Sequence, residues 1–188
     1  MIRLRYRVLA VAAALAAVVA GCSERAPLKE PVLALSGPYR LDSGDRLRVV
    51  VYDQPSLTNL YEVDQSGQVS FPLIGDVPAR NSTTDQLAQR IETRLASAYL
   101  REPDVTVEIS EYRPFFVLGE VGAPGEYVYV PGITAETAIA KAGGFSDRAN
   151  KRRVRISRTV DGRLVETRIP VVEPIRPGDT IYVPESLF

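Results

Sequence analysis

A helical pattern of apolar positions occupies residues 84–99. The apolar residues at helical spacing are Leu87, Ala88, Ile91, Leu95, Ala98 and Tyr99. Charged residues lie between them, so the segment is expected to form an amphipathic helix that buries one face. Ser82 and Asp85 have capping-box spacing, which predicts that the helix begins directly after Ser82. It is expected to end before Pro103, because proline cannot continue the backbone hydrogen bonding.

Runs rich in valine, isoleucine and tyrosine on both sides of this helix predict strands. The predicted strands are residues 47–52, 61–64, 68–71 and, with strict alternation of apolar and polar residues, 105–109. Gln65-Ser66-Gly67 predicts a hairpin between the second and third of these, and Ile74-Gly75-Asp76 predicts another turn. Residues 37–111 are therefore expected to form one α+β domain with a small sheet and one main helix.

The remaining residues, 112–188, predict a second α+β domain. Its predicted strands are residues 115–121, 127–130, 163–171 and 181–183, together with the alternating segment around Val154 and Ile156. Thr134 is expected to cap a short helix that runs to Ala142 and is ended by two glycines. Asp161-Gly162 predicts a hairpin.

The N-terminus has the pattern of a secretory signal. Arginines precede an apolar run at residues 8–20, which is shorter than the roughly 20 residues that a membrane-spanning helix needs. The run leads into Val19-Ala20-Gly21-Cys22, which resembles the lipobox of bacterial lipoproteins. The resemblance implies a signal peptide at 1–21 and a palmitate-bearing lipid anchor on Cys22. Because Ser23 and not aspartate follows, it also implies the outer membrane. Residues 22–36 have no clear period and are expected to form a flexible tether.

The composition excludes several classes of function. The formal net charge is zero, whereas a nucleic-acid-binding protein would show a basic excess, so no nucleic-acid partner is expected. There is no histidine, which removes the commonest metal ligand and the usual acid–base group near neutral pH. A single cysteine cannot form an intramolecular disulfide or a thiolate cluster. We therefore expect no metal, no cofactor and no enzymatic activity.

One short pattern, an apolar residue followed by two spacers and Gly-Asp, occurs in both halves. The two copies are Leu41-Asp42-Ser43-Gly44-Asp45 and Ile175-Arg176-Pro177-Gly178-Asp179. Glycine permits positive φ, and the aspartate is expected to accept a bond from a backbone N–H two residues further on. Catalytic carboxylates are the other interpretation, which we disfavour because no base or metal ligand accompanies them. As turn residues, Gly44, Asp45, Gly178 and Asp179 should tolerate Asp179→Asn, since an amide oxygen also accepts a hydrogen bond.

Basic residues gather between residues 148 and 158. They are Arg148, Lys151, Arg152, Arg153, Arg155 and Arg158. One interpretation is a solvated strand face and loop. The other is a surface for an acidic glycan or for the negative face of a neighbouring subunit. On the second interpretation, Arg152, Arg153, Arg155 and Arg158 line an export lumen or contact a partner.

The motifs in the two halves resemble two known domains. Residues 39–45, 72–75 and 103–109 resemble the polysaccharide biosynthesis/export domain. Residues 117–121, 124–127 and 177–183 resemble the soluble-ligand-binding β-grasp (SLBB) domain. The chain is thus identified as a short member of the outer-membrane polysaccharide export lipoproteins, with an export domain at 37–111 and one SLBB domain at 112–188.

This resemblance implies a role in transport. It implies a homo-oligomeric ring on the periplasmic side of the outer membrane that carries capsule polysaccharide or exopolysaccharide and docks on an inner-membrane polysaccharide copolymerase. The longest members pierce the outer membrane with a C-terminal amphipathic helix that this sequence lacks. A separate outer-membrane β-barrel is therefore expected to supply the pore. The alternative is a monomeric periplasmic lipoprotein that binds a soluble glycan or other ligand through its β-grasp domain.

Overall fold

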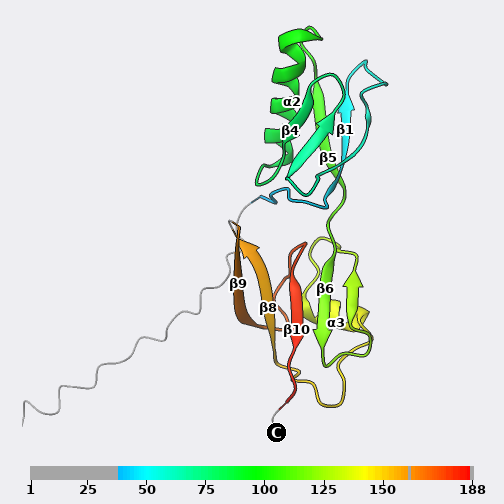
Figure 1. Cartoon of the computed structure of the whole chain (residues 1–188). Helices are drawn as coiled ribbons and strands as arrows, with labels where there is room; N and C mark the ends of the chain where they lie inside the picture. Colours follow the sequence, from blue (N-terminus) through cyan, green and yellow to red (C-terminus); the bar gives the residue numbers. More distant parts are fainter. Residues whose placement is uncertain (1–37, 161, 187–188) are drawn as a thin grey trace, which may run out of the picture. The chain divides into compact units, whose positions relative to one another are not determined.

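The computed structural model describes residues 38–160 and 162–186, which lie in one compact unit, Gly37–Phe188 (Figure 1). Its first half contains a three-stranded antiparallel sheet in the order β2-β1-β5, formed by β1 (Arg46–Val51), β2 (Asn59–Glu62) and β5 (Val105–Glu111). A two-stranded antiparallel sheet consists of β3 (Gln68–Phe71) and β4 (Gly75–Pro78). The helix α2 (Thr84–Ala98) packs against β5 and β4.

Alternation of residue types explains how this half buries its core. Leu47, Val49 and Val51 of β1 are buried, whereas Arg46 and Arg48, which alternate with the first two, are exposed. Leu87, Ile91 and Leu95 lie on the buried face of α2, which confirms the amphipathic helix expected from the sequence. Both sets belong to one hydrophobic cluster.

The start of α2 differs from the prediction by one residue. Thr83, not Ser82, is the N-cap: its hydroxyl accepts the Gln86 N–H, and the Gln86 side chain accepts the Thr83 N–H. Ser82 is instead buried and accepts a hydrogen bond from Arg90. The predicted capping pair of Ser82 and Asp85 is therefore wrong, because glutamine completes a capping box as well as an acid does.

Two turns in the first half also differ. The predicted hairpin at residues 65–67 does form a tight turn, closed by a 2.9 Å bond from the Asp64 N–H to the Gln68 carbonyl. The strands on either side do not pair with each other, because β2 joins β1 and β3 joins β4. The turn predicted at Ile74-Gly75-Asp76 lies earlier, with Leu73 at φ 69°, and Gly75 opens β4.

The second half is a five-stranded sheet with one helix. Its strands are β6 (Phe115–Gly119), β7 (Gly125–Tyr127), β8 (Arg153–Val160), β9 (Arg163–Pro170) and β10 (Thr180–Val183), in the order β7-β6-β10-β8-β9. The last strand, β10, runs parallel to β6 in the centre of the sheet, and the other neighbours are antiparallel (Figure 1). Together with α3 (Ala135–Lys141), this is the order of a β-grasp, so the α+β class expected for both halves is confirmed.

Local details of the second half agree with the sequence except at one strand. Thr134 caps α3 through a 3.2 Å bond from the Thr137 N–H to its hydroxyl. The return strand predicted at residues 127–130 is β7, which already ends at Tyr127. Val128 and Val130 follow it as exposed residues outside any strand, since β6 offers partners only as far as Tyr127.

Candidate functional site

The first glycine–aspartate turn holds a fully buried carboxylate. Gly44 has a φ of 90°, and Asp45 is 0% exposed. The Asp45 carboxylate accepts hydrogen bonds from the Asp42 N–H at 2.9 Å and from the Tyr39 hydroxyl at 2.8 Å. It also accepts the Arg113 N–H at 3.0 Å, and the Arg113 guanidinium lies 3.4 Å away. The buried charge is therefore both hydrogen-bonded and matched by an opposite charge.

The second turn repeats this arrangement with a closer ion pair. Gly178 has a φ of 81°, and Asp179 is also 0% exposed. The Asp179 carboxylate accepts the Arg176 N–H at 2.7 Å. Arg158 donates to both carboxylate oxygens, from Nε at 2.7 Å and from Nη2 at 2.6 Å. This bidentate geometry is the strongest that arginine forms with a carboxylate.

Each aspartate side chain accepts its turn hydrogen bond from a residue before it in the chain, whereas the sequence predicted a residue after it. Asp45 and Asp179 bind the backbone N–H three residues before them, not the one two residues after them. In return, each donates its own N–H to the carbonyl of that same earlier residue at 3.2 Å. These contacts support a structural role for both carboxylates, since every oxygen is already bonded inside the protein.

Arg113, which connects β5 to β6, touches both turns. A Cβ atom added to Gly178 would lie 2.5 Å from its Nε, and one added to Gly44 would lie 3.4 Å from its Cβ. The Gly178 N–H also donates to the neighbouring Pro114 carbonyl at 2.9 Å. At Gly178 the Arg113 side chain would have to move to admit a Cβ atom, whereas at Gly44 a Cβ atom would make an ordinary contact, so the positive φ is the main reason for glycine at both turns.

The Tyr39 hydroxyl belongs to the buried hydrogen-bond network around Asp45. Burial raises the pKa of its hydroxyl far above 10, although the Arg113 charge opposes the shift. The folded state therefore favours the protonated phenol, and this contribution to stability is lost as pH rises above 10. Tyr39→Phe should lower the free energy of unfolding by about 1 kcal/mol at pH 7, since Asp45 loses a donor. In urea titrations, the difference between wild type and variant should shrink at pH 11; an unchanged difference would contradict this.

The residues of the predicted arginine surface do not all lie on the same face of the sheet. Arg152, Arg153 and Arg155 are exposed, as expected for residues that face solvent. Arg158, which the sequence predicts to be part of the same surface, is only 7% exposed and is bound to Asp179. Its position in β8 has the same parity as the buried Val154 and Ile156, so Arg158 cannot line a lumen.

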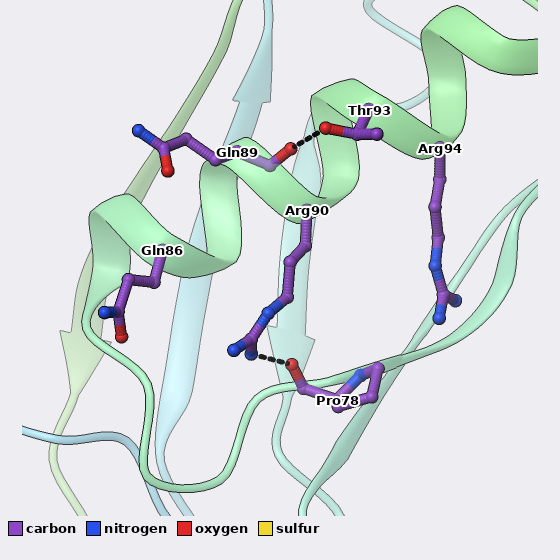
Figure 2. Close-up of a pocket in the computed structure, with 6 residues that line it drawn as sticks. All are labelled: Pro78, Gln86, Gln89, Arg90, Thr93 and Arg94. Atoms are coloured by element: carbon purple, nitrogen blue, oxygen red, sulfur yellow. Dashed lines mark hydrogen bonds between the residues drawn. The ribbon is translucent and has the colours of Figure 1, made fainter.

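A polar groove lies beside α2, and no sequence pattern predicted it. It encloses about 580 Å³ and is lined by Pro78, Gln86, Gln89, Arg90, Thr93 and Arg94 (Figure 2). Arg90 donates to the Pro78 carbonyl at 2.8 Å, and Arg94 donates to the Asp76 carbonyl at 2.5 Å. Both arginines point from the helix toward the β4 segment, so their hydrogen bonds connect α2 to β4 (Figure 2).

Two further observations concern chemistry and membranes. In the described part of the chain, no group of acidic or cysteine residues could hold a metal ion. None of the described helices is long and apolar enough to cross a membrane. Cys22, the predicted lipidation site, lies outside the described residues.

Two family models match the chain in succession. The model described as "Polysaccharide biosynthesis/export protein" matches residues 34–110, and the SLBB domain model matches residues 114–167. The chain belongs to the polysaccharide biosynthesis/export family. Proteins of this family are transport components and not enzymes, in agreement with the expectation from composition.

Curated relatives carry names from the same process. The chain is 33% identical over 178 residues to "Exopolysaccharide production protein ExoF" of Rhizobium meliloti (strain 1021), covering 82% of this chain and 42% of that protein. It is 29% identical over 156 residues to "EPS I polysaccharide export outer membrane protein EpsA" of Ralstonia nicotianae. This match covers 68% of this chain and 40% of that protein. The chain thus spans less than half the length of these relatives.

Proposed function

We propose that this chain is a subunit of a polysaccharide export conduit on the periplasmic side of the outer membrane. The observation that carries the proposal is the direct succession of an export domain and a β-grasp SLBB domain, each matched by its own family model. The relatives named for exopolysaccharide production and export support it. The buried, fully bonded carboxylates support a structural role for the glycine–aspartate motifs and no chemistry on the polymer.

A ring of identical subunits is the assembly that we propose. The two edges of the five-stranded sheet are different strands, β7 and β9, so contact between them would be head-to-tail, the type of contact that closes rings. Exposed aliphatic residues support such contact: Val128 is 62% exposed just after β7, and Leu164 is 69% exposed on β9. The inner-membrane copolymerase and the separate outer-membrane pore stay predictions from the family resemblance.

The proposed anchor is a lipid on Cys22. Each buried methylene contributes about 0.8 kcal/mol, so several acyl chains on one cysteine would hold the protein at the membrane firmly. Residues 22–36 would then connect the anchor to the folded unit.

Complementation in the native host tests this function. Deletion of the gene should leave polysaccharide inside the cells, and the full chain should restore secretion. The same strain supplied with Cys22→Ser should secrete far less and should not incorporate labelled palmitate. Unchanged secretion after deletion would reject the export role, and normal secretion by Cys22→Ser would reject the anchor. A wild-type protein that sediments as a monomer in detergent would favour the alternative, a solitary glycan-binding lipoprotein.

A further inference from the structure

One face of the five-stranded sheet carries an exposed row that crosses four strands. The strand register pairs Leu118 with Tyr182, Tyr182 with Arg155, and Arg155 with Arg168. All four side chains are exposed, while their chain neighbours Val117, Ile156 and Ile181 are buried on the other face. We name these four residues the arginine–tyrosine row.

Tyr182 holds the first arginine in place. The Arg155 guanidinium carbon lies 4.5 Å from the centre of the Tyr182 ring, a cation–π contact. A guanidinium on an aromatic face keeps its N–H groups available at its edge, where a carboxylate can bind two of them. Arg155 is therefore preorganised to receive an anion.

Arg155 and Arg168 form an unfavourable pair in the protein alone. Residues directly opposite on antiparallel strands have Cβ atoms about 5 Å apart, and like charges there repel. Within residues 38–160 and 162–186, no carboxylate lies within salt-bridge distance of either guanidinium. An anionic group placed between them would relieve the repulsion.

The length and composition of the row suit a polymer. Neighbouring strands are about 4.8 Å apart, so four strands span about 14 Å, which accommodates a short extended stretch of a sugar chain. Leu118 and, one row away, Phe116 add exposed apolar surface next to Tyr182. Exposed ion pairs are individually weak because water and salt screen them, which allows a polymer to be held and released repeatedly.

We propose that the arginine–tyrosine row binds the carboxylate groups of an acidic polysaccharide. The inference rests on the proposed export function and specifies the class of substrate. The row has two arginines, and the acid one row away, Glu166, accepts a hydrogen bond from Ser157, so the row favours an anionic glycan over a neutral one. In this assignment Arg155 and Arg168 contact the carboxylates, and Tyr182 is a positioning residue for Arg155.

Calorimetric titration of the purified full-length protein in detergent tests this assignment. Oligogalacturonate is the acidic probe and a dextran oligomer of equal length is the neutral one. The wild type should bind oligogalacturonate, with affinity that falls as salt rises, and should not bind dextran. The double variant Arg155→Gln/Arg168→Gln should bind at least tenfold more weakly. Tyr182→Phe should stay near wild type, whereas Tyr182→Ala should lose several-fold.

The matched control is Arg163→Gln. Arg163 is an exposed arginine on the same strand, β9, but at the opposite parity from Arg168, so its loss changes net charge without touching the row. An equal loss of affinity in the control would show a net-charge effect and overturn the proposal. So would equal binding of dextran, or a double variant that changes the sedimenting species but not glycan binding, which would make the row a subunit contact.

The two proposals can fail separately. If the wild type restores secretion in the deletion strain but the purified protein does not bind oligogalacturonate, the row assignment is wrong and the export function stands. If the protein binds oligogalacturonate as described but deletion leaves secretion intact, the export function is wrong and the binding site stands.

Discussion

Asp179→Ala is expected to lower the free energy of unfolding by about 3–5 kcal/mol, because it leaves the Arg158 guanidinium buried without its counter-charge. The variant also frees the Arg176 N–H, which donates to the same carboxylate. Urea denaturation followed by circular dichroism measures the change. Arg158→Met in the Asp179→Ala background should recover part of the loss, since it removes the unpaired charge.

A surface ion pair provides the control for this prediction. Arg148 and Glu185 lie 3.7 Å apart with side chains 77% and 57% exposed, so Glu185→Ala should cost less than about 1 kcal/mol. If Asp179→Ala were as mild as Glu185→Ala, the buried pair would not be what holds this turn. Asp179→Asn should behave more like alanine than the sequence suggests, because the amide supplies one acceptor oxygen and no charge to Arg158.

Gly119→Ala is expected to cost more than about 3 kcal/mol or to prevent folding of the second half. Gly119 has a φ of 89°, where an alanine already costs about 1–2 kcal/mol. The added Cβ would also lie 2.2 Å from the Val183 carbonyl oxygen, a backbone atom of the neighbouring strand β10 that cannot swing aside. The urea midpoint and the near-ultraviolet circular dichroism spectrum should both report this loss.

Gly125→Ala is the matched control in the same sheet. Gly125 opens β7, has no positive φ, and has no atom within 4 Å of the position that a Cβ would take. Its replacement should change stability by less than about 0.5 kcal/mol. A Gly119→Ala protein with the midpoint of Gly125→Ala would show that β6 and β10 do not approach as closely as described.

The elements of the fold could be predicted where local patterns decide them. The spacing of Leu87, Ile91 and Leu95 was sufficient for α2, and alternation was sufficient for β5. Strand pairing was not predictable in this way: the tight turn at residues 65–67 suggested a β2–β3 hairpin, but the partners are β1 and β4. That choice depends on contacts with distant residues, which local periodicity does not contain.

The candidate site was predictable in part for the same reason. The glycine–aspartate motifs marked both turns, but not the arginine partners, which lie 68 residues from Asp45 and 21 residues from Asp179. Arg158 was grouped with exposed arginines because it is near them in sequence, although its strand parity matches Val154 and Ile156. Arg168 was missed because only the β8–β9 register places it opposite Arg155.

The parallel pairing of β6 with β10 has a consequence for the order in which the chain acquires structure. The central position in the sheet stays empty until residues 180–183 are available, because β10 separates β6 from β8. A growing or translocating chain that has emerged only as far as β9 has two unconnected hairpins, β6–β7 and β8–β9, and each exposes an apolar edge. Such long-range closure is slow relative to helix formation. The second half is therefore vulnerable to aggregation and proteolysis until its last strand arrives, and it becomes a sheet in one late step.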